Sequence, residues 1–398
     1  MAVFVVGEPG PTTPISDNSI VKISWVTYAP FEVIDGVPVS AEADGRYRVF
    51  APVRELAASG HDVEVIQFAP ENSAAGMLAL IAGEVVVLGK LVPRNQQVFD
   101  ERAAAALDLV RRLQARGVKV IADINDNHFE NPARADYFRA LANAVDAIVA
   151  STPQMAQVVR RYSAKPVTLA RDPYEGERGE PAFAPSRPRW WQKIIAGPVD
   201  GARLKLLWFG YPANLDTLAL LMEQLLPLAQ HQPMSIHVVS RQGSVGEELC
   251  REMQAASGAR IRWTFAAWSP AEMRKAFADT DLVVLPSKPA DARKAVKSPN
   301  RLVNALWAGR LVIAHPLPAY QEFAEFASIV DDMAAGVRWA LDHPDEVTAR
   351  IRRGQAYIDS NYSARAAARE WEHAITTVCS VGDAATDPQD HGLKLGEA

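Results

Sequence analysis

The segment KSPNRLVNALWAGRLVIAHP, residues 297–316, indicates the fold of this chain. Ser298 and Pro299 suit the N-cap and first position of a helix, and Gly309 suits the end of that helix. Four apolar residues lie on one face between those ends: Leu302, Val303, Leu306 and Trp307. The apolar residues after Gly309 are typical of a buried strand. The segment therefore predicts a capped helix that leads into a core strand.

The start of the same helix has the chemistry of an anion site. Its free amides and the positive end of its dipole favour a negative charge. Arg301, in the first turn, can grip a phosphate with two hydrogen bonds, and Lys297 adds a second charge. An ordinary capped surface helix with solvated basic residues explains these features equally well, so both interpretations stay open at this point.

Short apolar strands alternate with amphipathic helices on both sides of this segment. This alternation predicts an α/β chain with two Rossmann-like doubly wound domains, each built on a parallel sheet. The expected strands of the first series are residues 20–28, 62–68, 84–89, 118–123 and 146–151. Those of the second series are residues 204–210, 235–240, 259–265, 281–286, 310–315 and 328–331. Ligands of paired α/β domains bind at the carboxyl ends of the strands, in the cleft between the domains.

A stretch rich in Pro, Gly and charge, residues 171–203, separates the two series and contains the expected connection. The predicted organisation, in chain order, is a flexible N-terminus (1–19), an N-terminal acceptor domain (20–185), an interdomain linker (186–203), a C-terminal donor domain (204–360), a C-terminal helix that returns to the N-terminal domain (361–380) and a disordered tail (381–398).

Composition excludes several classes of protein. A chain of 398 residues with 48% hydrophobic and 22% charged residues is ordinary for a globular protein, and its net charge of -5 argues against nucleic-acid binding. Cys250 and Cys379 form no metal-ligand pattern or disulfide framework. The N-terminus lacks the pattern of a signal peptide, and the apolar run at 74–89 is too short to span a membrane. We therefore expect a cytoplasmic protein without a transmembrane segment.

Several motifs together resemble those of GT-B glycosyltransferases, in particular the retaining, nucleotide-sugar-dependent enzymes of the glycosyltransferase group 1 (family 4-like) type. In the C-terminal half these motifs are LKLLWFGYPANLDTLALL, DLVVLPS, KSPNRLVNALWAGRLVIAHPLPAYQEF and YIDSNYSARAAAREWEHAI. Weaker similarities lie upstream, in GRYRVFAPVRELAASGHDVEVI, DAIVASTPQM and RDPYEG. The resemblance covers most of residues 20–378, and its specific motifs lie in the C-terminal half.

The resemblance implies a donor site in the C-terminal domain. Arg301 takes the place of the family's diphosphate-binding Lys or Arg, beside Lys297 and Ser298. Asn304 and Val296 occupy the positions of the two glutamates in the family's Glu-x7-Glu pattern, so the usual ribose and sugar contacts are altered. An amide still hydrogen-bonds a hydroxyl group, which keeps Asn304 compatible with donor binding.

Three further segments belong to the implied donor site. The loop at Gly210 and Tyr211 lies near the donor phosphates and sugar, and glycine allows a close backbone approach. Trp268 precedes a capping box and can stack a nucleobase, while Glu322 can contact a sugar hydroxyl. A plain turn, a packing tryptophan and a solvated helix start are the respective structural alternatives.

Polar residues of the N-terminal half provide candidates for catalysis and acceptor binding. ADINDNHFEN follows the strand at 118–121, so Asp126 and His128, with Asp123 nearby, stand at a carboxyl edge where a general base is useful. An Asx-rich turn explains the same cluster. Gly45, Arg46 and Arg48 form the expected loop and helix start on the acceptor side, where the arginines meet either an anion or solvent.

These observations predict a hexosyl-type glycosyltransferase, with retention favoured by the resemblance, that moves a sugar from a nucleotide sugar such as a UDP- or GDP-sugar during bacterial-type glycan or glycoconjugate synthesis. No tightly bound cofactor or metal is expected. The acceptor stays open among saccharides, lipid-linked saccharides, proteins and small molecules, and with it peripheral contact with a membrane. Two other functions also stay open: an inactive nucleotide- or partner-binding subunit, favoured by the missing glutamates, and a nucleotide-sugar epimerase.

Overall fold

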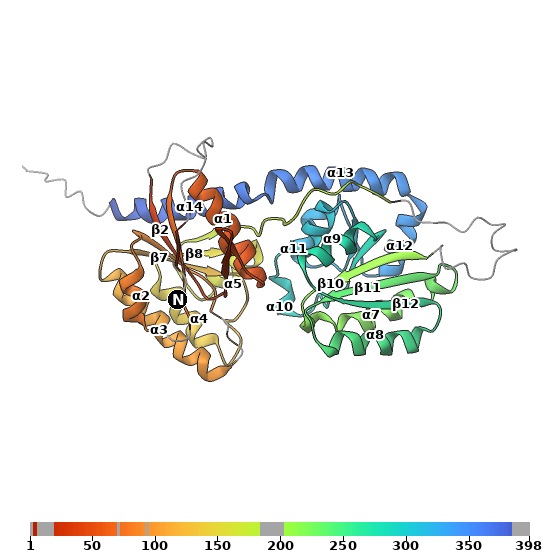
Figure 1. Ribbon diagram of the computed structural model, residues 1–398, viewed down its shortest axis with the longest axis horizontal. Coiled ribbons are helices and arrows are strands. Elements are labelled where there is room, and N and C mark those ends of the chain that lie inside the picture. Colours follow the sequence, from red (N-terminus) through yellow and green to blue (C-terminus); the bar gives the residue numbers. More distant parts are fainter. Residues whose placement is uncertain are drawn as a thin grey trace, which may run out of the picture. The chain divides into compact units, whose positions relative to one another are not determined.

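The chain folds into two compact units (Figure 1). The computed structural model describes residues 3–5, 20–69, 72–91, 93, 95–183 and 203–383. Unit 1 comprises residues 1–171 with 364–398, and unit 2 comprises residues 172–363. None of the helices in the described ranges is both long and apolar enough to cross a bilayer.

Unit 1 is built on a sheet with the strand order β1-β5-β2-β6-β7-β8-β9. Neighbouring strands are parallel except β1, which pairs antiparallel with β5. The strands are β1 (Val3–Val5), β2 (Lys22–Thr27), β5 (Asp62–Gln67), β6 (Val85–Leu88), β7 (Lys119–Ile124), β8 (Ala147–Ala150) and β9 (Val167–Leu169). The wholly apolar strands β6 and β8 are buried along their length, as expected for a sheet covered on both faces.

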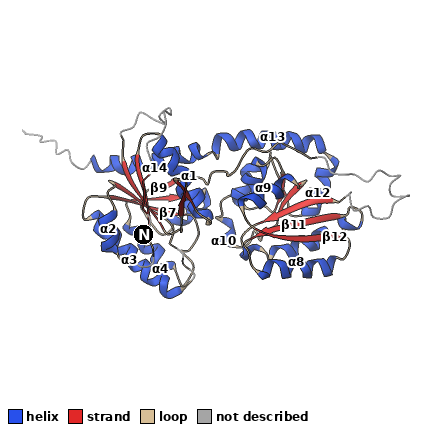
Figure 2. Ribbon diagram, in the orientation of Figure 1, coloured by secondary structure: helices blue, strands red, loops and turns tan. Residues whose placement is uncertain are grey.

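Helices cover the sheet of unit 1, and a small hairpin precedes the first of them (Figure 2). The helices are η1 (Gly45–Phe50, a π-helix), α1 (Ala51–Ala58), α2 (Ala74–Leu80), α3 (Gln96–Gln114), α4 (Ala135–Ala144), α5 (Pro153–Arg160) and α14 (Ala364–Asp383). The hairpin pairs β3 (Glu32–Ile34) with β4 (Val37–Val39). Side-chain caps from Ser73, Asn95 and Thr152 fix the starts of α2, α3 and α5.

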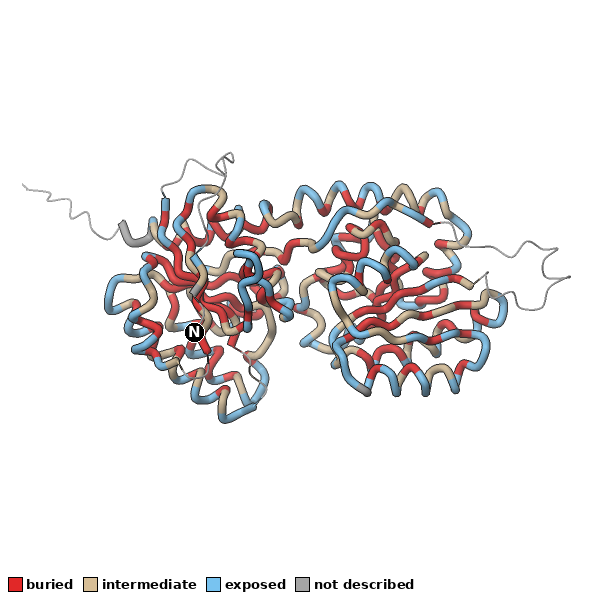
Figure 3. The backbone as a smooth tube through the Cα atoms, viewed as in Figure 1, coloured by how far each residue is buried: buried red, intermediate tan, exposed pale blue. Residues whose placement is uncertain are grey.

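The C-terminal helix α14 packs in the core of unit 1 (Figure 3). Trp371 lies edge-on to Trp25 of β2, with ring centroids 4.6 Å apart, a contact worth about 0.5–1.5 kcal/mol beyond the buried area. The backbone N–H of Val21 donates to Nδ1 of His61, whose Nε2 lies 3.5 Å from a buried oxygen of Glu372. These contacts fix the returning helix on the sheet.

Unit 2 is built on a parallel sheet with the order β12-β11-β10-β13-β14-β15. Its strands are β10 (Leu204–Phe209), β11 (Met234–Ser240), β12 (Ile261–Ala267), β13 (Leu282–Leu285), β14 (Leu311–Ala314) and β15 (Ser328–Ile329). Each of them coincides with one of the apolar runs from which the second series is predicted. β13 and β14 are buried along their whole length, which confirms the core strand expected after Gly309.

Helices lie on both faces of this sheet, with α7 and α8 on one side and α9, α11 and α13 on the other (Figure 1). The α-helices are α7 (Thr217–Leu225), α8 (Ser244–Ser257), α9 (Pro270–Ala278), α10 (Ala292–Ala295), α11 (Asn300–Trp307), α12 (Met333–Asp342) and α13 (Pro344–Asn361). Three 3-10 helices complete the unit: η2 (Pro212–Asn214), η3 (Leu228–Gln230) and η4 (Pro318–Phe323).

The segment at 172–183 belongs to unit 2, whereas the sequence predicts an N-terminal domain that extends to residue 185. The reason is its packing against the end of α11. Tyr174 stacks on Trp307 with ring centroids 3.9 Å apart, and the N–H of Gly179 donates to the carbonyl oxygen of Trp307 at 2.9 Å. Burial of two aromatic rings outweighs the polar, loop-like composition of this segment.

At the N-terminus, β1 lies within the stretch 1–19 for which the sequence predicts a flexible segment. Its three residues pair with β5 because the edge of that strand offers unpaired backbone groups. The expected linker at 186–203 and tail at 381–398 lie almost entirely outside the described residues.

We predict that Gly309→Ala strongly destabilises unit 2. Gly309 has a φ of 77°, and a Cβ atom there would lie 2.2 Å from the carbonyl oxygen of Glu180. The left-handed conformation alone costs about 1–2 kcal/mol for alanine, and the backbone clash adds about 1–3 kcal/mol.

The matched control is Gly176→Ala, in the same unit, where φ is 81° but a Cβ atom meets open space. Urea unfolding of both variants measures the difference. Equal losses of unfolding free energy would show that the segment at 179–182 is not packed on the end of α11.

Candidate functional site

The strand order of unit 2 reverses between β10 and β13. From β10 the chain proceeds to β11 and β12 on one side of the sheet, and then returns to β13, β14 and β15 on the other. In open α/β sheets, ligands bind at the carboxyl ends of the strands where the order reverses. We therefore built the candidate site from the side chains that gather at the ends of β10, β13 and β14.

Arg301 and Gly210 meet at this edge. Arg301 Nη1 lies 3.4 Å from the carbonyl oxygen of Phe209 and 3.2 Å from where a Cβ atom of residue 210 would be. The N–H of Gly210 donates to Val239 at 3.1 Å, and its carbonyl oxygen accepts from the hydroxyl of Ser240 at 2.8 Å. The glycine loop is thus held in place beside the guanidinium.

Two lysines add positive charge around Arg301. Burial lowers the pKa of Lys294, and the neighbouring charges of Arg301 and Lys297 lower it further, although Asp216 and Asp291 act in the opposite direction. A partly buried group of cations that repel one another is stabilised by a bound anion. Lys294 was not among the expected site residues, and its only local signal in the sequence is the basic run ARKAVK.

The start of α11 differs from the expected cap. Pro299, rather than Ser298, is the N-cap residue, and no side chain caps the helix. The helix therefore begins one residue later than the sequence indicates. Ser298 Oγ is buried and has no hydrogen-bond partner among the described residues, so it retains the capacity to bond a ligand.

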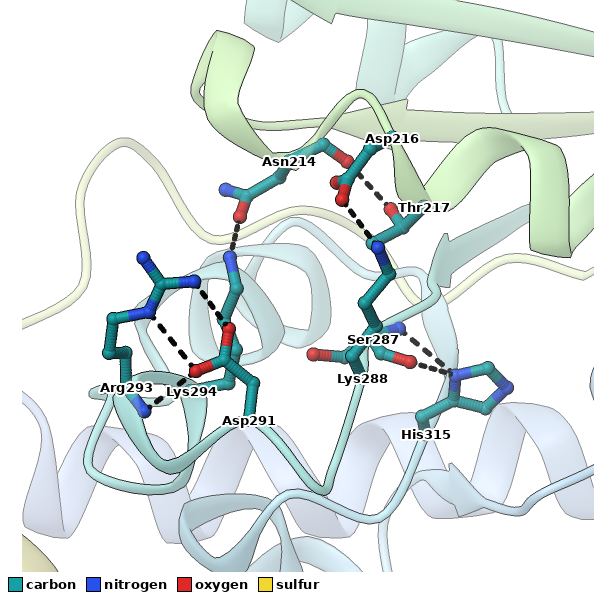
Figure 4. A network of polar contacts seen from close by, with 9 residues as sticks. All are labelled: Asn214, Asp216, Thr217, Ser287, Lys288, Asp291, Arg293, Lys294 and His315. Carbon is teal, nitrogen blue, oxygen red and sulfur yellow. Dashed lines mark hydrogen bonds and ion pairs between the residues drawn. The ribbon is translucent and has the colours of Figure 1, made fainter.

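Figure 4 shows the polar contacts that hold the loop between β13 and α11. Lys288 Nζ lies 2.6 Å from a carboxylate oxygen of Asp216, and Lys294 Nζ donates to the side chain of Asn214. Both contacts join this loop to the one that follows β10. Lys288 and Lys294 are therefore held in position by the same loop that carries Gly210.

His315 follows β14 and was not among the expected site residues. Its Nδ1 lies 3.0 Å from the nitrogen and 2.7 Å from the oxygen of Ser287, so the backbone after β13 fixes its ring. Its Nε2 is buried and has no hydrogen-bond partner among the described residues. The sequence signal for it is its place directly after a buried strand.

Asn304 and Glu322 have packing roles. Asn304 is buried, and its side-chain oxygen accepts from the N–H of Glu175 at 2.8 Å, which fixes the segment at 172–183. Glu322 accepts hydrogen bonds from the hydroxyl groups of Tyr357, at 3.0 Å, and Tyr362, which join η4 to α13.

Aromatic side chains lie at the β11 and β12 side of the same edge. The N–H of Trp268 donates to Ser240 at 2.7 Å, and its ring packs partly buried against the core of unit 2. Tyr211 is 46% exposed, and the guanidinium carbon of Arg241 lies 5.6 Å from its ring centre. After Trp268, Ser269 caps α9 as expected. The exposed ring of Tyr211 thus lies beside the Arg241 guanidinium at this edge.

In unit 1, the side chain of Arg48 is buried and bonds other groups of the protein. Its Nε and Nη2 bond the two carboxylate oxygens of Asp123 at 3.1 and 2.6 Å, and its Nη1 donates to the carbonyl oxygen of Ala170. Its guanidinium also lies 5.2 Å from the ring centre of Trp371, and only 2% of the side chain is exposed. Arg48 therefore contacts neither of the two partners expected from the sequence, an anionic ligand or solvent.

Gly45 and Arg46 shape the segment before η1. A Cβ atom at residue 45 would lie 2.8 Å from the side chain of Ser40, so glycine is needed for this close approach. Arg46 Nη1 donates to the carbonyl oxygen of Ala41 at 2.8 Å and thereby fixes the chain after the hairpin.

Asp126 and His128 lie after β7, as the sequence predicts for a carboxyl edge. Asp126 pairs with Lys90, and the ring of His128 lies 4.8 Å from that of Phe138. Asn125, next to Asp126, donates to Asp44 at 2.7 Å. The structure thus adds Asp44, Lys90 and Asn125 to this edge, none of which was an expected site residue.

Within the part of the chain that the structure describes, no three His, Cys, Asp or Glu residues are arranged to hold a metal ion. Burial raises the pKa of the Cys250 thiol to about 11, so this side chain is an inert core residue at neutral pH.

We predict that Arg48→Met lowers the free energy of unfolding by about 3–5 kcal/mol, because Asp123 is left buried without its cation. The double variant Arg48→Met/Asp123→Leu is expected to recover much of this loss. Arg54→Met, on the exposed side of α1, is the matched control. Urea unfolding measures all three, and a loss no larger than in the control would contradict the buried pairing.

Comparisons with known proteins agree with this architecture. Residues 241–373 match the family model described as glycosyl transferase-like. A glycosyltransferase from Rickettsia africae aligns with a TM-score of 0.62 and 11% identity, over 91% of this chain and 99% of that one. HepE of Anabaena, solved with UDP-glucose, aligns with a TM-score of 0.61 and 12% identity, over 90% of this chain and 100% of that one.

TarM of S. aureus aligns with a TM-score of 0.54 and 11% identity over 75% of this chain, which spans 57% of the length of TarM. The curated protein sequences contain no match. At these identities the structural similarity establishes the fold. The chain therefore has the GT-B fold with two Rossmann-like domains, as the motifs predict, and it carries a glycosyl transferase-like domain over residues 241–373.

Proposed function

We propose that this chain is a glycosyltransferase that binds a nucleoside diphosphate sugar at the carboxyl edge of unit 2 and transfers its sugar to a hydroxyl acceptor. The observation that carries the proposal is the group formed by Arg301, Lys294 and Lys297 beside Gly210, where the strand order reverses. The glycosyl transferase-like match includes this group, and HepE was solved with UDP-glucose, so a UDP-sugar is the first donor to test.

The proposed role of the cations is to stabilise the leaving group. When the bond between the anomeric carbon and the phosphate oxygen breaks, its electrons remain on the diphosphate. Fixed positive charges at that position stabilise the developing charge without reorganisation during the reaction. Arg301 suits this task because its side chain is held beside the glycine loop.

Retention of the anomeric configuration is the stereochemical expectation from the resemblance, and we carry it as part of the proposal. The proton NMR coupling of the anomeric proton in the first product distinguishes retention from inversion. The same spectrum separates transfer from hydrolysis and from epimerisation of the donor sugar.

A second candidate is a subunit that binds a nucleotide sugar without transferring it. Two observations favour it: Val296 is buried with 3% exposure, and Asn304 bonds the backbone of Glu175. The two positions of the family's glutamates are thus used for packing. Saturable UDP-sugar binding without release of UDP, in the presence of varied acceptors, would favour this candidate.

We predict that UDP raises the melting temperature of the chain and that Arg301→Ala weakens UDP binding about ten- to hundredfold, the usual effect of losing a charge-assisted hydrogen bond. A thermal-shift titration with UDP, GDP and their sugars measures this. Arg338→Ala, at an exposed pair with Asp332 in the same unit, is the control. If no nucleotide shifts the melting temperature, the proposed donor site is wrong.

We also predict a pH dependence that depends on Lys294. Because the pKa of Lys294 is lowered in the free protein, the side chain loses its proton as the pH rises into the alkaline range. Binding of a diphosphate requires the charged form, so the affinity for UDP falls with rising pH.

Lys294→Arg keeps its charge throughout this range and is expected to flatten the decline. The ratio of the UDP dissociation constants of the two proteins, measured by calorimetry from pH 7 to 10, cancels any titration of UDP itself. A ratio that does not change with pH would show that Lys294 does not bind the diphosphate.

A further inference from the structure

Four polar side chains of unit 1 meet at the carboxyl edge of its sheet. Asp44 precedes η1, Lys90 follows β6, and Asn125 and Asp126 follow the neighbouring strand β7. Asn125 Nδ2 donates to Asp44 Oδ1 at 2.7 Å, and Lys90 pairs with Asp126. The side chains of Lys90 and Asp126 are 22% and 15% exposed, so this end of the group reaches the surface.

Asn125 has an unused hydrogen-bond acceptor in this group. Its Oδ1 is buried and has no partner among the described residues. The orientation of the amide is fixed, because exchanging Oδ1 and Nδ2 would place an oxygen against the Asp44 carboxylate. A buried carbonyl oxygen without a donor is costly, and the O–H group of a ligand would supply that donor.

The two carboxylates of the group differ in their partners. Asp126 bonds the ammonium of Lys90, whereas Asp44 accepts from a neutral amide. Burial raises the pKa of Asp44, with the Asp126 charge in the same direction, while Lys90, the Asn125 bond and Arg48 act against the rise. Burial lowers the pKa of Lys90, but the charges of Asp126 and Asp44 outweigh it and raise the pKa. Lys90 therefore stays charged.

The balance of donors and acceptors selects a class of ligand. Two carboxylates and one amide oxygen accept hydrogen bonds, and the single cation, Lys90, is already paired. An anionic group would be repelled by the carboxylates, whereas neutral hydroxyl groups satisfy them. The segment that carries Asp44 is held in place by the close approach of Gly45 to Ser40, so the acceptors are fixed before a ligand binds.

We propose that Asp44, Lys90, Asn125 and Asp126 form the acceptor site, and that it binds a neutral polyhydroxyl compound, a sugar or polyol, whose hydroxyl groups donate to Asp44 and to Asn125 Oδ1. This assignment rests on the proposed function, because it supplies the acceptor for the same transfer. In this assignment Asp126, which pairs with Lys90, helps to hold the ligand in place.

The test uses the full chain and ligand-observed saturation-transfer NMR, with UDP present. The neutral probes are the methyl α-glycosides of glucose, galactose, mannose and N-acetylglucosamine, and glucose 6-phosphate is the anionic probe. We expect at least one neutral glycoside to bind more tightly than the phosphate. Asp44→Asn and Asn125→Leu are each expected to weaken it about tenfold or more, the effect of losing a bond to a buried or charged acceptor.

Asp62→Asn is the matched control, since Asp62 is an exposed aspartate at the amino end of β5 in the same unit. The UDP-induced rise in melting temperature, measured on every variant, reports folding and donor binding independently. If UDP still binds but no neutral glycoside does, or if Asp44→Asn and Asn125→Leu bind it like Asp62→Asn, the acceptor assignment is wrong and the donor site stands. If UDP does not bind the unmodified chain, the proposed function fails instead.

Discussion

The parallel arrangement of the buried strands is the constraint on which both candidate sites depend. Parallel strands end at one edge of the sheet, so the loops that follow them are collected there whatever their distance in sequence. In unit 2 this brings Arg301 to the carbonyl oxygen of Phe209, 92 residues earlier, and joins Gly210, Ser240 and Trp268 through successive hydrogen bonds. The same constraint in unit 1 places the residues after β6 and β7 beside each other.

The elements of the fold could be predicted from the sequence because their signals are local. Apolar runs such as 282–285 and 311–314 are buried strands in the structure, and the pairing of Gly210 with Arg301 follows once the sheet is assembled. The partners of isolated polar residues could not be predicted in this way. Arg48 bonds Asp123, 75 residues away, and Asn304 bonds the backbone of Glu175, 129 residues away. A charge or amide that satisfies a distant buried group has the same sequence signature as one that binds a ligand.

Other residues could not be identified from the sequence because their surroundings, and not their local context, give them their properties. Lys294, Lys90 and Asp44 stand in unremarkable local contexts, and each acquires its character from neighbours supplied by other loops. Burial, together with the charges of Arg301 and Lys297, lowers the pKa of Lys294. For Lys90, the charges of Asp126 and Asp44 outweigh burial and raise the pKa. Identical side chains are thereby placed in opposite surroundings: Lys294 would be stabilised by the proposed diphosphate, and Lys90 is neutralised within the protein.

The charge near Arg301 also bears on how the donor sugar is recognised. The two acidic side chains that act on Lys294, Asp216 and Asp291, are paired with Lys288 and Arg293. The two positions of the family's glutamates hold a buried valine and an amide engaged in packing. The segment from α10 to α11 therefore offers strong groups for a diphosphate and few acceptors for sugar hydroxyls. Affinity for the donor would come chiefly from its phosphates, and discrimination among sugars would rest on groups outside this segment, such as His315 after β14, whose Nε2 has no hydrogen-bond partner among the described residues.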